Sequence, residues 1–122
     1  MINYGKQSIN QDDIDAVIEV LESDFLTQGP KVEEFENDLR SYCGSKHARV
    51  VTNATSALHL AYVAIGLKKD DIVWTSPNTF VSTANAALYC GAKVEFVDID
   101  PKTYNISIEA LKAKLKLSLI HI

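Results

Sequence analysis

The residues best suited to chemistry lie in the segment Asn53–Ala61, where the hydroxyls of Thr55 and Ser56 open an apolar helical pattern. The β-branched run Val50–Thr52 precedes it, so the pattern predicts a strand that turns directly into a helix. The first N–H groups of a helix have no partner within the helix and lie at the positive end of its dipole. Hydroxyl groups there can join these N–H groups around a phosphate. The alternative is that Asn53 or Thr55 only caps the helix.

Two further polar segments, Ser76–Thr83 and Asp98–Asp100, each follow an expected strand. Phe80 falls near a helix start, where it is either ordinary core or a ring that stacks on a planar ligand. The two carboxylates are either part of a ligand site or helix-capping and turn-forming side chains around Pro101. Because ligands of parallel sheets bind beyond the carboxyl ends of the strands, we expect these segments and the first one to share a site.

The elements that must position these segments alternate along the chain. Two helices come first, and the order β-α-β-α-β-α follows, which predicts an α/β fold with a largely parallel sheet, right-handed crossovers and helices on its faces. The predicted helices are one opened by a capping box of Asn10 and Asp13, then Pro30 to Gly44, Thr55–Ile65, Pro77–Tyr89 and one capped by Ser107. The predicted strands are His47–Thr52, Asp71–Thr75 and Lys93–Val97, and Asp98–Asn105 is a polar loop.

Composition excludes several classes of function. The chain has 122 residues, enough for one modest domain, and its net charge of -4 gives no electrostatic reason to expect nucleic acid or an anionic membrane as partner. No apolar run approaches the roughly 20 residues of a membrane span, and the first residues lack a signal-peptide core. Cys43 and Cys90 have no metal-ligand spacing and are expected to be small buried thiols of a cytoplasmic protein.

Taken together, the ordered motifs resemble the DegT/StrS-type sugar aminotransferases, which use pyridoxal 5'-phosphate. The matching segments are Ser23–Pro30 ahead of Glu33–Glu36, then Asn53–Ala61, Ser76–Ala86 and Val97–Tyr104. The resemblance implies the N-terminal part of the large domain of a fold-type I transferase, a three-layer α/β/α structure with a mostly parallel sheet. The amino-acid sequences of Ser23–Gly29 and Asn53–Leu58 look most like those of the transaminases that aminate C4 of a UDP-linked 4-keto-6-deoxy-N-acetylhexosamine, as in pseudaminic acid biosynthesis.

The resemblance also implies roles for single residues. Thr55 and Ser56, with the backbone N–H of Ala54, would bind the cofactor phosphate, and Phe80 would lie against the pyridine ring. The residues that would border the sugar-nucleotide site are Tyr4, Asp24, Phe25, Leu26, Thr27 and Ala54. Many relatives have glycine at the position of Ala54, and a methyl group is tolerated there if φ stays negative.

The reaction implied by the resemblance moves an amino group from L-glutamate to the keto sugar, with the cofactor as electron sink. It needs a lysine that holds the cofactor as a Schiff base and a carboxylate near the ring nitrogen. Neither is identifiable in this sequence, so no catalytic residue is assigned, and both are expected beyond the end of the chain. The resemblance further implies a homodimeric parent enzyme.

We therefore expect three regions. Residues 1–30 would be an N-terminal helix with a substrate-side loop, and residues 31–116 a partial cofactor-binding domain. Leu117–Ile122 are expected to be a non-native tail, because the transposon-end adapter CTG TCT CTT ATA CAC ATC translates in frame to these six residues. The alternative is a genuine apolar fourth strand.

Two other functions remain open. One is a dehydratase relative that uses the same cofactor without a lysine linkage. The other is a non-catalytic phosphate- or nucleotide-binding α/β module, although no Gly-x-Gly-x-x-Gly or Walker sequence follows any expected strand.

Overall fold

The computed structural model describes residues 5–120, with side chains described through Leu117. Tyr4, one of the expected substrate-site residues, lies outside the described residues. The chain forms two compact units, Met1–Val50 and Val51–Ile122, which are described separately.

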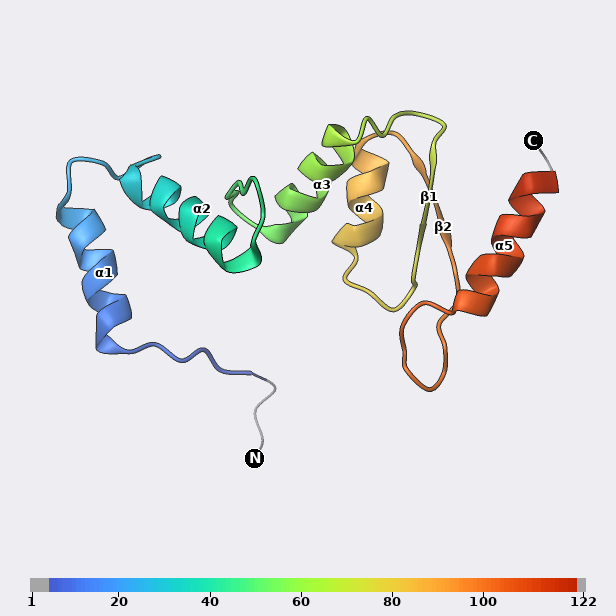
Figure 1. Ribbon diagram of the computed structural model, residues 1–122, viewed down its shortest axis with the longest axis horizontal. Coiled ribbons are helices and arrows are strands. Elements are labelled where there is room, and N and C mark those ends of the chain that lie inside the picture. The colour runs from blue at the N-terminus through green and yellow to red at the C-terminus, as the bar shows by residue number, and fades with distance from the viewer. Residues whose placement is uncertain (1–4, 121–122) are drawn as a thin grey trace. The chain divides into compact units, whose positions relative to one another are not determined.

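The first unit holds two helices, α1 (Gln11–Glu22) and α2 (Pro30–Cys43) (Figure 1). The predicted capping box opens α1: the Asp13 N–H donates to Asn10 Oδ1 at 3.1 Å, and the Asn10 N–H donates to Asp13 Oδ2 at 2.9 Å. Pro30 occupies the first turn of α2, and Gly44 ends it in the left-handed region at φ 63°. Both helices were predictable because these start and stop signals act locally.

The predicted strand over residues 47–52 is wrong. The Val50 N–H donates to Glu36 Oε1 at 2.9 Å instead of to a neighbouring strand, and Arg49 pairs with the other oxygen of the same carboxylate. These contacts lower the pKa of Glu36 below its ordinary value, chiefly through the hydrogen bond from the Val50 N–H. The Glu36 carboxylate thus accepts the backbone N–H of Val50 that a neighbouring strand would otherwise accept.

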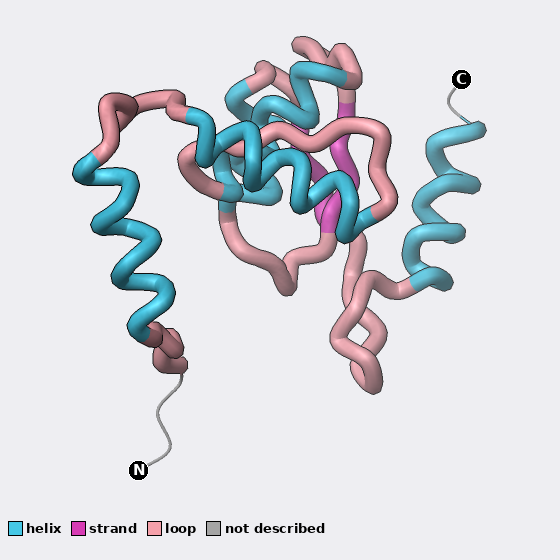
Figure 2. The backbone as a smooth tube through the Cα atoms, turned by 60° about the vertical axis from the view of Figure 1, so that its left-hand side comes forward, coloured by secondary structure: helices cyan, strands magenta, loops and turns pink. Residues whose placement is uncertain are grey.

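The second unit contains α3 (Ala54–Ala64), β1 (Ile72–Thr75), α4 (Ser82–Tyr89), β2 (Lys93–Phe96) and α5 (Ile108–Ile120). The two strands pair in parallel, with Trp74 opposite Glu95 and Thr75 opposite Phe96. Figure 2 shows the strands of this small sheet in magenta. The described residues therefore hold two of the three predicted strands.

Helix α4 begins at Ser82 rather than at Pro77, so the predicted start is wrong by five residues. The Ser76 hydroxyl accepts the Asn78 N–H at 3.2 Å, and this local bond holds the segment as a turn. A side chain that bonds nearby backbone in this way competes with helix formation. At the other end of the chain, α5 continues through Ile120, so residues 117–120 are helical and do not form the alternative fourth strand.

The core of the second unit is small. Its buried apolar residues are Ala86, Ala87, Ala92 and Val97, joined by the buried polar residues Thr75 and Ser82. Helix α3 packs against α4, where the Tyr62 hydroxyl lies 3.5 Å from the Thr83 carbonyl oxygen and the ring of His59 meets that of Tyr89 edge to face, 5.6 Å apart.

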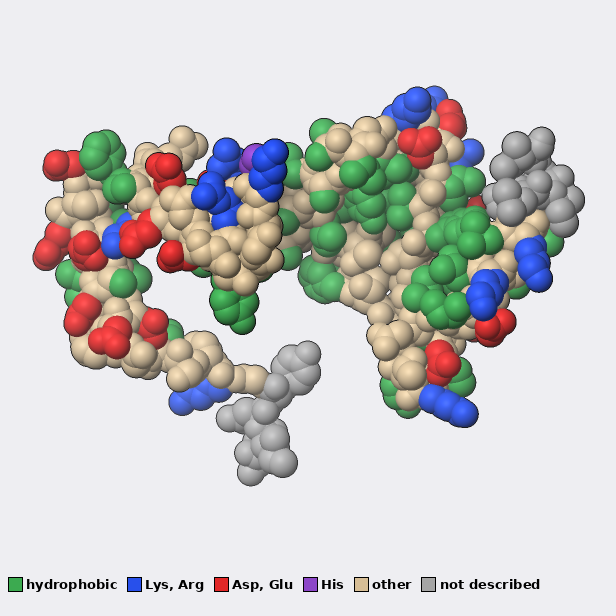
Figure 3. All heavy atoms as spheres, in the orientation of Figure 1, with side chains coloured by type: hydrophobic (Ala, Val, Ile, Leu, Met, Phe, Trp, Pro, Cys, Tyr) green, Lys and Arg blue, Asp and Glu red, His purple; other side chains and the backbone are tan. Residues whose placement is uncertain are grey.

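Many large apolar side chains remain on the surface. Figure 3 shows hydrophobic side chains exposed in both units. Leu21 is 63% exposed and Ile65 is 76% exposed. Cys43 is exposed and Cys90 half-buried, so the expectation of two buried thiols is wrong; α2 and α4 end there with little of the chain packed over them. Among the described residues no helix has the length and apolar character needed to cross a membrane.

Candidate functional site

The candidate site lies where the strands of the second unit end. β1 and β2 run in the same direction, and α3 and α4 begin at the end where the strands finish (Figure 1). The loop after β1 and the loop after β2 also meet by contact: Asn78 Nδ2 donates to the Tyr104 carbonyl oxygen at 3.4 Å. The topology therefore brings the expected polar segments to one edge of the sheet.

At the start of α3, the capping alternative is correct for Asn53. Its Oδ1 accepts the Ser56 N–H at 2.9 Å, and its carbonyl accepts the Ala57 N–H at 3.1 Å. The N–H groups of Ala54 and Thr55 have no helical acceptor, because no residue lies four positions earlier in the helix.

The hydroxyls of Thr55 and Ser56 are half-buried and form no hydrogen bond within the part of the chain that the structure describes. Two N–H donors and two hydroxyl donors thus remain at the positive end of the helix dipole. Capping and anion binding are compatible here, since the Asn53 side chain accepts only one of the first-turn N–H groups, that of Ser56.

Phe80 is 71% exposed, so it is not part of the core that the described residues form. It sits in the turn between β1 and α4, where its carbonyl oxygen accepts the Thr83 N–H at 3.0 Å. The hydroxyl groups of Thr79 and Thr83 form a hydrogen bond across the same turn, with their oxygens 3.1 Å apart. The backbone of the turn is held, and the ring is available to a planar ligand.

The carboxylates after β2 act in the turn around Pro101. Asp98 Oδ1 accepts the Ile99 N–H at 2.8 Å, and Asp100 Oδ1 accepts the N–H groups of Lys102 and Thr103 at 2.7 and 3.1 Å. The turn-forming interpretation is therefore correct for both. Within the described residues, no group of three or more His, Cys, Asp or Glu side chains is placed to hold a metal ion.

Sequence reasoning missed a polar cluster of Trp74, Glu95 and Lys114. Lys114 Nζ lies 2.7 Å from Glu95 Oε2, which also accepts the Trp74 Nε1–H at 3.2 Å. The hydrogen bond from Lys114 lowers the pKa of Glu95 below its ordinary value, its positive charge and the Trp74 bond adding to the effect. No signal in the sequence pairs these residues, because the register of β1 on β2 is a tertiary property.

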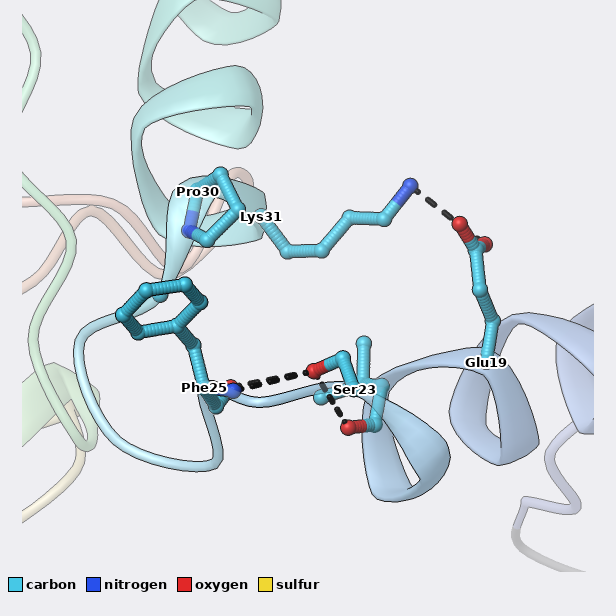
Figure 4. Close-up of a pocket in the computed structure, with 7 residues that line it drawn as sticks. Glu19, Ser23, Phe25, Pro30 and Lys31 are labelled. Atoms are coloured by element: carbon cyan, nitrogen blue, oxygen red, sulfur yellow. Dashed lines mark hydrogen bonds and ion pairs between the residues drawn. The ribbon is translucent and has the colours of Figure 1, made fainter.

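In the first unit, the loop Asp24–Thr27 adjoins a small pocket (Figure 4). Phe25 lines the pocket, whereas Asp24, Leu26 and Thr27 do not. The other lining residues are Glu19, Val20, Ser23, Gly29, Pro30 and Lys31.

Local contacts hold the Phe25 backbone in place. The Ser23 hydroxyl donates to the Val20 carbonyl oxygen at 2.8 Å and accepts the Phe25 N–H at 3.3 Å. Gly29 is required beside it, since an added Cβ would lie 2.9 Å from Phe25 Cβ. Lys31 Nζ pairs with Glu34 at 3.2 Å and with Glu19 at 3.5 Å, and these bonds and charges raise the pKa of Lys31.

Known proteins resemble this chain in both sequence and fold. It is 55% identical over 115 residues to the UDP-4-amino-4,6-dideoxy-N-acetyl-beta-L-altrosamine transaminase of Campylobacter jejuni strain 81-176, an alignment that covers 94% of this chain and 30% of that protein. The spore coat polysaccharide biosynthesis protein SpsC of Bacillus subtilis is 44% identical over 110 residues, which cover 90% of this chain and 28% of SpsC.

Two solved structures illustrate the fold. The putative sugar aminotransferase Spr1654 of Streptococcus pneumoniae superposes with a TM-score of 0.87 at 26% identity, covering 92% of this chain and 29% of that one. A DegT DnrJ EryC1 StrS aminotransferase from Brucella abortus superposes with a TM-score of 0.80 at 32% identity. The match covers 88% of this chain and 29% of that one. The predicted α/β fold with parallel strands, part of a fold-type I aminotransferase, is confirmed.

The chain spans about 30% of the length of the curated relatives named here. The model of the DegT/DnrJ/EryC1/StrS aminotransferase family matches residues 7–118, which is nearly the whole chain. The resemblance seen in the sequence motifs is confirmed, and the chain belongs to the DegT/DnrJ/EryC1/StrS aminotransferase family.

Proposed function

We propose that the full-length protein carrying this chain is a pyridoxal-phosphate-dependent aminotransferase that acts on a nucleotide sugar. It moves an amino group from L-glutamate to C4 of a UDP-linked 4-keto-6-deoxy-N-acetylhexosamine, a step of pseudaminic acid biosynthesis. The observation that carries the proposal is the 55% identity to the Campylobacter jejuni transaminase over 94% of this chain.

The residues at the start of α3 fit the cofactor phosphate. The N–H groups of Ala54 and Thr55 lack helical partners, and the hydroxyls of Thr55 and Ser56 add two donors beside them. Such an arrangement binds a phosphate through hydrogen bonds and through the helix dipole. When bound, pyridoxal phosphate would supply an electron sink for the loss of a proton from the carbon that bears the amino group.

Phe80 supports the same site from the neighbouring loop. Its ring is 71% exposed at the carboxyl end of β1, and we propose that it lies against the pyridine ring of the cofactor. The ring would orient the cofactor and exclude water from one face of it.

We propose that Tyr4, Asp24, Phe25, Leu26, Thr27 and Ala54 border the sugar-nucleotide site. Among them Phe25 is supported by its place in the lining of the pocket of the first unit. We further propose a cytoplasmic homodimer, in line with the resemblance to the family.

The test is an assay of the purified full-length protein with pyridoxal phosphate, L-glutamate and the UDP-linked 4-keto sugar. We expect a product in which an amine replaces the C4 oxygen, identified by mass and by NMR assignment of the position. A product that has lost water without gaining nitrogen would instead indicate the dehydratase alternative. Binding of NAD or ATP without binding of pyridoxal phosphate would overturn the proposal in favour of the non-catalytic module.

A further inference from the structure

Lys114 of α5 is tied to both strands of the sheet. Its Nζ lies 2.7 Å from Glu95 Oε2, donates to the Phe96 carbonyl oxygen at 3.2 Å, and lies 5.4 Å from the centre of the Trp74 ring. Its side chain is only 25% exposed, less than those of the other paired lysines of the described residues. Three contacts of one ammonium group therefore tie α5 to both strands.

These contacts anchor the loop between β2 and α5 at both ends. Phe96 is the last residue of β2, and Lys114 lies in the second turn of the helix that begins after the loop. Within the loop, Ile99 and Ile106 form an antiparallel bridge, and the Ser107 N–H donates to the Asp98 carbonyl oxygen at 2.8 Å. The loop is a closed hairpin whose base is fastened by Lys114.

The tip of this hairpin touches the turn that carries Phe80. Tyr104 adopts a positive φ of 60°, an uncommon conformation for a bulky residue, and its carbonyl oxygen accepts Asn78 Nδ2. Asn78 is held from the other side, since its N–H donates to the Ser76 hydroxyl at 3.2 Å. Phe80 follows two residues later.

We propose that Lys114 is a positioning residue for the candidate cofactor site, which it serves by fastening the hairpin that holds Asn78 and thereby the turn presenting Phe80. The inference rests on the proposed function, because it assumes that Phe80 lies against a bound cofactor. Lys114 touches neither cofactor nor substrate in this arrangement. Its effect passes through the hairpin and the Asn78–Tyr104 hydrogen bond.

The experiment measures pyridoxal phosphate affinity in the full-length protein, at a temperature well below the melting transition of every variant. Lys114→Met keeps the apolar stem on Trp74 but removes the charge and the donors, and we expect it to weaken binding about three- to tenfold. Lys114→Arg keeps the charge and the donors and should stay within about twofold of the parent. Lys112→Met is the matched control, because Lys112 lies on the same helix, 63% exposed, and pairs only within α5 with Glu109.

A double-mutant cycle separates positioning from general stability. If Lys114 acts through Phe80, Lys114→Met should cause no further loss of pyridoxal phosphate affinity in a Phe80→Leu background. An unrelated loss of stability would instead add to the loss of affinity caused by Phe80→Leu. Asn78→Ala should behave like Lys114→Met and should likewise not add to it. Full additivity in both cycles, or unchanged affinity in Lys114→Met, would overturn the inference.

Failure of the inference can be told apart from failure of the proposed function. If Phe80→Leu alone leaves pyridoxal phosphate affinity unchanged, Phe80 does not contact the cofactor and the proposed site is wrong. If Phe80→Leu weakens binding while Lys114→Met does not, the site stands and only the positioning role is lost. Should Lys114→Met fail to fold, Glu95→Gln removes the partner of the same ammonium group and replaces it in both cycles.

Discussion

A phosphate at the start of α3 would meet backbone and side-chain donors that substitution can separate. The N–H groups of Ala54 and Thr55 survive any side-chain change, whereas the hydroxyls of Thr55 and Ser56 do not. Asn53 caps the helix by itself, so the hydroxyls are not needed to start it. Their loss therefore tests ligand binding with little effect on the helix.

We predict that Thr55→Ala combined with Ser56→Ala weakens pyridoxal phosphate binding to the full-length protein at least about tenfold. Each hydrogen bond to a charged phosphate contributes on the order of 1.5–3 kcal/mol, and about 1.4 kcal/mol corresponds to a factor of ten. The measurement is a titration followed by cofactor absorbance, with Thr52→Ala as the matched control because Thr52 is an exposed hydroxyl residue just before the helix. An unchanged affinity in the double variant would leave these residues with no role beyond the first turn of α3.

At the scale of elements, the sequence predicted those whose signals are local. The capping box of Asn10 and Asp13, Pro30 at the start of α2 and the β-branched run in β1 each involve residues that are near neighbours in the chain. The same is true of Ser107, whose hydroxyl accepts the Ala110 N–H at 3.1 Å at the start of α5. Such contacts form whatever the rest of the chain does.

Elements that depend on distant partners were predicted less well. Val50–Thr52 has strand-forming residues, but the Val50 N–H bonds to Glu36, fourteen positions earlier, and no periodicity reveals this. The site was partly predictable for the same reason: the topology brought Asn78 and Tyr104 to one edge, whereas the role of Lys114 depends on the register of two strands. Pattern fixes the type of an element more readily than its partner.

The attachment of α5 gives a prediction about acid stability. Because Lys114 lowers the pKa of Glu95, this carboxyl binds its proton less readily in the folded chain than in the unfolded one, where the ordinary value is 4.5. Its contribution to stability is therefore fully present above about pH 4.5 and is lost as the pH falls through the lower folded value. Glu95→Gln removes this dependence, so in the full-length protein we expect the melting temperature of the variant to fall less steeply than that of the parent between about pH 5 and about pH 3.

Thermal unfolding followed by circular dichroism at several pH values checks this prediction. The Glu95→Gln variant retains Glu36, whose pKa is also lowered, so some acid dependence of its melting temperature should remain. Glu109→Gln is the matched control, since Glu109 is 86% exposed and pairs only with Lys112 on its own helix. If the melting temperatures of the parent and of Glu95→Gln fall equally as the pH is lowered, the ion pair with Lys114 does not stabilise the fold.

At the scale of the whole molecule, apolar surface outweighs the buried core. The buried apolar residues are three alanines and Val97, while apolar side chains such as Leu21, Ile65 and Phe96 are more than half exposed. Within the described residues the sheet has two short strands, and each has an edge with unpaired N–H and C=O groups. Unpaired edges and large apolar patches both favour association with other chains.

We therefore predict that the 122-residue chain, expressed by itself, associates at micromolar concentration and unfolds without a sharp transition. Two short strands and a core of small residues bury too little apolar area to offset the entropy of ordering the chain. Sedimentation velocity across a tenfold concentration range measures the association, and Ile65→Lys, which places a charge on the most exposed of the large aliphatic side chains, should shift the distribution toward smaller species. A monomer at every concentration, with a cooperative melting curve that Ile65→Lys leaves unchanged, would show that the chain is stable alone and that its exposed apolar side chains do not drive association.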